Sequence, residues 1–161
     1  MKGKSVNSLL VIALTITFFG FTGFALAQDK PADNMEIVKE KIRTDKKLFI
    51  ANNMQLTESE ARTFWPVYEA HQAELGKLVE REIKLIENFA AKFETMSDDV
   101  AKDLLDKSLA IDSDYQKLRQ TYLAKFRGVL SDKKVARYYQ LENKINAVFE
   151  YELARKIPLV Q

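Results

Sequence analysis

The chain has 161 residues and no cysteine, which excludes disulfides, thiolate metal sites, a cysteine nucleophile and a lipid-modified cysteine. Its 25 basic residues nearly balance its 23 acidic residues, so it has no strong positive field to attract nucleic acid. The five glycines and three prolines are too few for strands joined by tight turns or for a phosphate-binding loop. We therefore predict an all-α protein with no cofactor and no nucleic-acid partner.

Residues 1–27 have the pattern of a cleavable secretory signal peptide. Two lysines precede an apolar run over residues 9–26, and the small side chains of Ala25-Leu26-Ala27 suit a signal peptidase. We expect cleavage after Ala27 and a periplasmic or secreted protein with no stable membrane span. The alternative is a retained membrane anchor, because the apolar run approaches the roughly 18–20 residues of a spanning helix.

Residues 28–33 are polar and should form a mobile tether to a single helical domain over residues 34–161. The first helix is predicted from about Asn34 to Asn52, with a thin apolar face. The lysines around that face, Lys46 among them, are interpreted as solvated. Asn52 and Asn53 should end the helix, since asparagine tolerates the left-handed conformation.

The stretch from Leu56 to Phe93 predicts one long amphipathic helix, because apolar residues recur three or four positions apart. Thr57 and Glu60 have the T-x-x-E spacing of a capping box, in which each side chain bonds the other residue's amide. From Thr57 onward, about 37 residues at about 1.5 Å each give a rod of roughly 55 Å. A compact domain of this size would measure about 35–40 Å, so the molecule should be elongated or the helix bent.

Two residues inside this helix predict local distortion. Pro66 predicts a kink, because proline has no amide hydrogen and its ring crowds the carbonyl of the preceding turn. The alternative is that Pro66 itself begins the helix. Gly76 weakens the helix relative to alanine, so it should mark the close approach of another helix or a second bend.

The aromatic residues Phe64, Trp65 and Tyr68 flank Pro66. We interpret them as core residues, and the alternative is an aromatic cluster that binds a partner. His71, the only histidine, lies on the same apolar stripe and is interpreted as a packed, hydrogen-bonded core residue. It is the weak candidate for a metal ligand, which would need nearby carboxylates or a second subunit to complete a site.

The third helix should begin after Ser97 as N-cap and end at Gly128 in the left-handed conformation. The turn before Ser97 is short, so the second and third helices are expected to form a long antiparallel hairpin. Ser131 should cap a fourth helix that runs to about Lys156 and packs on this hairpin. The fold class predicted is an elongated all-α bundle of about four helices.

Two acidic residues, Glu142 and Glu152, fall beside the apolar face of the fourth helix. A carboxylate pair for acid–base catalysis would need another acid opposite them in a pocket. Positions in water at the edge of the face are favoured instead. No catalytic residue is assigned, and we expect the protein not to be an enzyme.

Two helix starts, Leu56-Thr57-Glu58-Ser59-Glu60 and Leu130-Ser131-Asp132-Lys133-Lys134, resemble the Leu-Thr-x-x-Gln motif that occurs twice in Spy/CpxP-type periplasmic proteins. Glu60 and Lys134 stand where the motif has glutamine, and Ser131 stands where it has the second threonine. The resemblance implies a long bent helical hairpin that dimerises into a cradle. It also implies structural roles for the matching positions, which are Leu56, Thr57, Leu130 and Ser131.

This resemblance implies an ATP-independent chaperone or an envelope-stress protein, whose partners would be unfolded or envelope proteins and a second copy of the chain. The amphipathic hairpin favours the same class, because its apolar surface must be covered by another subunit or by a client. Two alternatives stay open. One is a metal-responsive or metal-buffering envelope protein with His71 as a ligand, and the other is a structural envelope component with a fixed partner.

Overall fold

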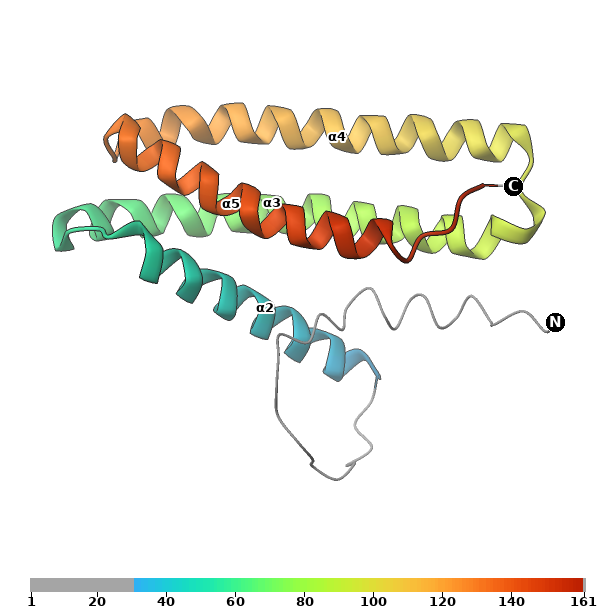
Figure 1. The fold of residues 1–161 in the computed structure, drawn as a ribbon, viewed down its shortest axis with the longest axis horizontal. Coiled ribbons are helices and arrows are strands. Elements are labelled where there is room, and N and C mark those ends of the chain that lie inside the picture. Colours follow the sequence, from blue (N-terminus) through green and yellow to red (C-terminus); the bar gives the residue numbers. More distant parts are fainter. Residues whose placement is uncertain (1–30, 161) are drawn as a thin grey trace, which may run out of the picture. The chain divides into compact units, whose positions relative to one another are not determined.

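The computed structural model describes residues 31–160, with side chains described from residue 41 onward. Within this part of the chain four α-helices and one short 3₁₀ segment follow one another, and no strand occurs (Figure 1). The predicted all-α class is confirmed. The expected signal peptide and residues 28–30 of the expected tether lie outside the described residues. No helix within residues 31–160 combines the length and the apolar character that crossing a membrane requires.

The described chain divides into two compact units, where the sequence predicted one domain. The first unit contains α2 (Pro31–Met54) and the part of α5 that begins at Leu141. The second unit contains α3 (Glu58–Lys92), η1 (Phe93–Thr95), α4 (Asp98–Arg127) and the part of α5 (Asp132–Ala154) up to Gln140. The boundary between the units therefore lies within α5.

In the second unit α3 and α4 lie side by side and run in opposite directions, with η1 as the short connection (Figure 1). Side-chain hydrogen bonds mark their register: Tyr122 Oη donates to Glu74 at 2.8 Å, Tyr115 Oη to Glu82 at 2.9 Å and Arg81 Nη1 to Asp114 at 2.7 Å. Later residues of α3 thus meet earlier residues of α4, which is the order of an antiparallel pair.

The beginning of α3 is the capping box that the sequence predicted. The Glu60 amide donates to Thr57 Oγ1 at 3.3 Å, and the Thr57 amide donates to Glu60 Oε2 at 2.8 Å. Two amides that have no partner inside the helix are satisfied in this way. Pro66 lies inside the continuous α3, so the alternative in which it begins the helix is wrong. The kink at Pro66 stays a prediction.

Two predicted helix ends are wrong in detail. The helix α2 continues to Met54, and the residue with left-handed backbone is Gln55, at φ 51°, rather than Asn52 or Asn53. The Asn53 side chain instead donates to the Phe49 carbonyl at 2.8 Å, which leaves its own backbone helical. At its N-terminal end, α2 begins at Pro31, three residues before the predicted start. Proline is favoured at the first position of a helix.

The end of α4 also differs from the prediction. Gly128 has φ −69°, so it is right-handed rather than left-handed. Its amide donates to the carbonyls of Ala124 at 3.1 Å and Lys125 at 3.2 Å, so the last turn tightens without a change of hand. At the other end of α4 the predicted N-cap is confirmed, because Ser97 Oγ accepts from the Val100 amide at 3.4 Å.

Gly76 does not mark the close approach of another helix. The residue is exposed, and a Cβ atom at its position would meet no atom within 4 Å. The prediction of close approach is therefore wrong. Glycine at this point of α3 leaves the helix weaker than an alanine would, without an evident packing reason.

We expect Gly76→Ala to raise the free energy of unfolding by about 1 kcal/mol, because alanine loses less backbone entropy on entering a helix. Urea unfolding followed by far-ultraviolet circular dichroism measures the change. Gly128→Ala is the matched control, because a Cβ there would lie 3.2 Å from the Lys125 carbonyl oxygen. This variant should gain less stability than Gly76→Ala. Equal or lower stability of Gly76→Ala would contradict the prediction.

Candidate functional site

The core of the second unit is a cluster of aromatic rings drawn from three helices. Its members have neighbouring ring centroids 4.5–6.2 Å apart, and we call them the aromatic junction: Phe64, Trp65, Tyr68, Tyr122, Phe126, Tyr138 and Tyr139. Ring pairs at these separations add about 0.5–1.5 kcal/mol beyond the area that they bury. The junction therefore holds α3, α4 and the first part of α5 together.

The three aromatic residues for which the sequence left partner binding as an alternative differ in their exposure to solvent. Phe64 is 0 % exposed and Tyr68 is 1 % exposed, so both belong to the core. Trp65 is half-buried beside them. A partner that approaches the folded unit reaches only Trp65 of the three.

His71 lies at one side of the aromatic junction and is 5 % exposed. Its Nδ1 atom is 2.9 Å from the Tyr138 hydroxyl, and its ring centroid is 4.8 Å from that of Tyr122 and 5.7 Å from that of Phe126. It is thus packed and hydrogen-bonded, as the sequence predicted for a core histidine. Within the described residues no group of three or more potential ligand side chains is placed to hold a metal ion.

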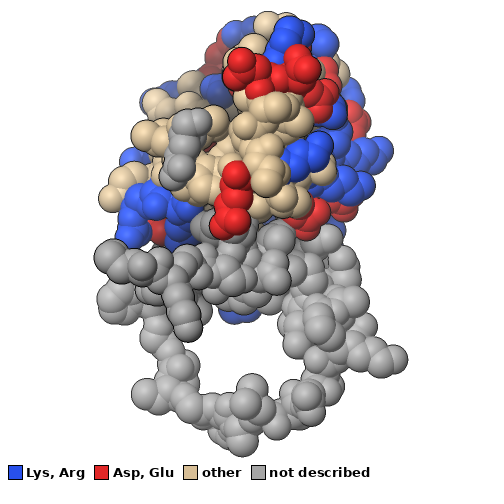
Figure 2. Space-filling view, turned by 90° about the vertical axis from the view of Figure 1, so that its right-hand side faces the viewer, with Lys and Arg blue, Asp and Glu red and all other residues tan. Residues whose placement is uncertain are grey.

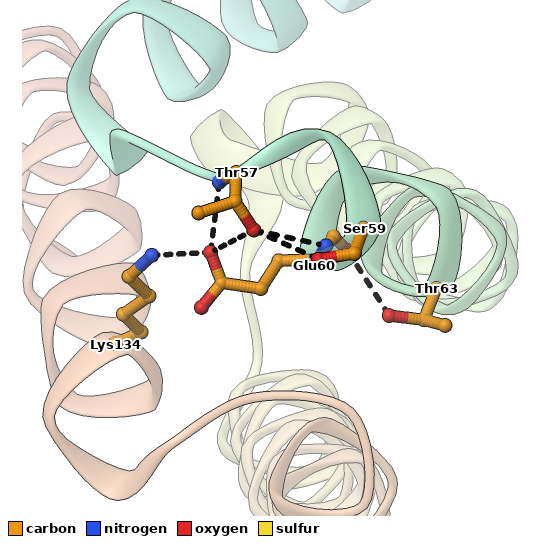
Figure 3. Close-up of polar contacts among 5 residues, drawn as sticks. All are labelled: Thr57, Ser59, Glu60, Thr63 and Lys134. Atoms are coloured by element: carbon orange, nitrogen blue, oxygen red, sulfur yellow. Dashed lines mark hydrogen bonds and ion pairs between the residues drawn. The ribbon is translucent and has the colours of Figure 1, made fainter.

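The two motif-like helix starts lie together in the second unit (Figure 3). The Lys134 ammonium, on α5, donates to the same Glu60 carboxylate oxygen that closes the capping box with Thr57. Glu60 and Lys134 are the two residues that replace the motif glutamines. The contact between the two helix starts is therefore an ion pair, with each side chain 26 % exposed.

The other motif positions have structural surroundings. Leu130 is buried and Leu56 is half-buried, which fits the structural roles that the resemblance implies. Ser131 immediately precedes α5, and its carbonyl accepts the Val135 amide at 2.9 Å in the first turn. Each motif thus supplies an apolar anchor and a helix start.

The Glu60 carboxylate is strongly stabilised in its charged form. The hydrogen bond from Lys134 and then the bond from the Thr57 amide lower the Glu60 pKa from 4.5 to about 2. The folded state therefore favours the charged form of Glu60 over the protonated form. Stability from this group is therefore fully present above pH 4.5 and is lost as the pH falls toward about 2.

We expect Glu60→Gln to lose less stability than the wild type between pH 4.5 and pH 2. The glutamine side chain can still accept the hydrogen bond from the Thr57 amide, but it has no carboxylate to protonate. Urea unfolding midpoints across this range measure the effect. Glu87→Gln, at an exposed position of the same helix, is the control and should keep the steep acid dependence of the wild type. An unchanged acid dependence in Glu60→Gln would count against this role for the ion pair.

The first unit contains an ion pair that the sequence did not predict. Lys46 Nζ on α2 lies 2.8 Å from Glu142 Oε2 on α5, with the two side chains only 13 % and 6 % exposed. The interpretation of Lys46 and Glu142 as solvated residues is wrong. Glu152 is half-buried and pairs with Arg155 at 3.0 Å on the same helix.

Several large apolar side chains are exposed on the helices. On α4 of the second unit, Leu105 is 60 % exposed and Leu109 is 57 % exposed, one turn apart, and we call them the α4 leucine pair. In the first unit, among the side chains described from residue 41 onward, the exposed large apolar ones on the helices are Leu48, Phe49, Val148 and Tyr151. Figure 2 looks onto the end where η1 connects α3 to α4 and shows uncharged surface bordered by both signs of charge.

No protein-family model, curated protein or solved structure matches the chain.

Proposed function

We propose that this chain is a non-enzymatic, secreted or periplasmic protein that binds unfolded or envelope proteins without ATP, as the resemblance to the Spy/CpxP group implies. The observation that carries the proposal is the α4 leucine pair. Single exposed leucines are ordinary, but two on one helical face offer a continuous apolar contact for an unfolded segment. A homodimer would be a second way to cover such surface.

The arrangement of the motif-like helix starts supports the same proposal. Glu60 and Lys134 are 74 residues apart in the sequence and are bonded to each other in the second unit. A negative charge at one glutamine position and a positive charge at the other allow a polar contact between the two helix starts. The two replacements, Glu60 and Lys134, are thus compatible with each other, which supports an architecture like that of the Spy/CpxP group.

The proposal is tested by adding the mature protein, without ATP, to an enzyme that aggregates on heating, and following light scattering. We expect equimolar protein to suppress the aggregation. Leu105→Asp with Leu109→Asp should weaken the suppression, because two charges on the apolar contact oppose the binding of apolar segments. The matched control is Ser113→Asp with Gln120→Asp, which adds the same charge at exposed positions of α4 and should retain the activity.

Two results would count against the proposal. Unchanged aggregation at equimolar or higher wild-type protein would remove its main support. Equal suppression by the leucine variant and its control would show that the α4 leucine pair is not the contact surface. The mass of the wild-type protein in solution, measured by sedimentation, distinguishes a monomer from the proposed homodimer.

A further inference from the structure

The α4 leucine pair lies in the middle of a longer seam along α4. From Leu105 and Leu109 the seam continues, at spacings of three residues, to Lys102 on one side and to Asp112 on the other. Spacings of three and four residues keep side chains on one face of a helix, and two helices of a coiled coil pack through such a seam. The seam is therefore a short apolar contact with a positive charge at one end and a negative charge at the other.

The four seam residues are exposed to solvent. The two leucines are more than half exposed, the Lys102 side chain is largely exposed, and Asp112 is exposed as well. Lys102 forms an ion pair with Asp106 of its own helix at 3.0 Å. Because exposed pairs within one helix are weak, Lys102 can exchange Asp106 for a carboxylate of another molecule.

Charge complementarity favours a second copy of α4 as the molecule that covers the seam. We consider two antiparallel copies related by a two-fold axis level with residue 107. Leu105 and Leu109 both lie two residues from this axis, so Leu105 of one protomer faces Leu109 of the partner subunit. Lys102 and Asp112 both lie five residues from it, so Lys102 faces Asp112 of the partner subunit. The symmetry repeats each contact.

A parallel pairing of the same seam is disfavoured by its charges. In register, it would place Lys102 against Lys102 of the partner subunit and Asp112 against Asp112 of the partner subunit, and like charges repel. Antiparallel pairing instead brings each charge to its opposite. The seam is thus complementary to itself in one direction, as a two-fold symmetric interface requires.

We propose that the α4 leucine pair is covered by the same pair of a second copy of this chain, in an antiparallel dimer that competes with client binding. Leucines and ion pairs of a single helix make a small contact, which belongs with the weak and reversible interfaces. A client segment can therefore displace the partner subunit. The competition rests on the proposed function, whereas the dimer does not depend on it.

Exchange of the seam charges tests the register. Sedimentation equilibrium of the mature protein gives the dimer dissociation constant of the wild type and its variants. Lys102→Glu and Asp112→Lys each place like charges opposite one another twice, so each should raise this constant about tenfold. The two substitutions together restore opposite charges, and the double variant should return to within about threefold of the wild type.

Asp103→Lys with Lys107→Glu is the matched control. The two residues form an exposed ion pair on the opposite face of α4, so exchanging their charges should leave the dissociation constant unchanged. A wild type that stays monomeric at about 1 mM would overturn the proposal. A double variant of Lys102 and Asp112 that dimerises no better than the single variants would overturn it too.

Disulfide trapping tests the same register without changing a charge. The chain has no cysteine, so Leu105→Cys and Leu109→Cys each carry one thiol. Under mild oxidation a mixture of the two variants should form cross-linked dimers faster than either variant alone, because position 105 faces position 109 of the partner subunit. Equal rates in the mixture and in the separate variants would contradict the register.

The aggregation assay separates this inference from the proposed function. At a concentration where the wild type is dimeric, Lys102→Glu and Asp112→Lys should both suppress aggregation more strongly, because both uncover the leucines although they change the local charge in opposite directions. Unchanged suppression by variants with a weakened dimer would refute the competition. If no variant suppresses aggregation while the dissociation constants change as expected, the proposed function and the competition fail and the dimer interface stands.

Discussion

Replacing either partner of the Lys46–Glu142 pair alone should lower the free energy of unfolding by about 3–5 kcal/mol, because the remaining charge stays buried without the opposite charge that lies 2.8 Å from it. The pair joins α2 to the second part of α5 within the first unit, at 2.8 Å and with little exposure of either side chain. Lys46→Met and Glu142→Leu are suitable variants, since each removes the charge and keeps an apolar side chain. Urea unfolding followed by circular dichroism measures the loss.

The double variant, Lys46→Met with Glu142→Leu, should recover most of this loss, because both charges are then absent and no desolvation cost is left. As a control, Lys107→Met breaks the pair with Asp103 on α4, whose side chains are 59 % and 51 % exposed. Such a surface pair contributes about 0.3–0.5 kcal/mol. A loss in Lys46→Met as small as in Lys107→Met would mean that water reaches the buried pair.

The features that the sequence predicted correctly depend on neighbours a few residues apart. The Thr57–Glu60 capping box needs only a spacing of three, and Ser97 with Val100 needs the same. The core position of His71 follows from the apolar periodicity of one helix. Local spacing therefore predicted the helices and their starts, because the atoms involved are brought together by the helix itself.

The features that were missed depend on how separate helices pair. Lys46 and Glu142 are 96 residues apart in the sequence, and each looks solvated when its own helix is considered alone. The hydrogen bond from Tyr115 to Glu82 likewise requires the register between α3 and α4. Apolar periodicity defines which face of a helix is buried, but it does not define which residue of another helix that face meets.

The boundary between the two compact units has no counterpart in the sequence pattern. The boundary lies between Gln140 and Leu141, inside a continuous helix that carries no glycine or proline at that point. The usual signs of a boundary are breaks in composition or chain-bending residues. A helix that contributes to two units shows neither sign, so its periodic pattern predicts one helix and one domain.

The burial of Phe64 agrees with the interpretation that the sequence favoured. The aromatic residues beside Pro66 were interpreted as core residues, with a partner-binding cluster as the alternative. With Phe64 completely buried against the rings of Phe126 and Tyr138, its first effect is on stability. The α4 leucine pair, by contrast, is exposed and open to a partner, although its spacing alone gave no indication of a role.

Phe126→Ala should destabilise the protein by about 3–5 kcal/mol, which is a large share of the 5–15 kcal/mol typical of a domain. Phe126 is 0 % exposed, and its ring centroid lies 4.5 Å from that of Tyr138, 5.7 Å from Phe64 and 5.7 Å from His71. Its loss would leave a cavity where α3, α4 and the first part of α5 meet, and aromatic neighbours on three helices cannot all collapse into it.

Urea unfolding followed by Trp65 fluorescence and by circular dichroism measures this effect, and Phe126→Leu should cost less because it leaves a smaller cavity. Leu105→Ala on the same helix is the control for loss of an apolar side chain, and because Leu105 is 60 % exposed its cost should stay within about 0.5 kcal/mol. Similar costs for Phe126→Ala and Leu105→Ala would show that the rings around Phe126 repack freely. The aromatic junction would then not be the element that holds the second unit together.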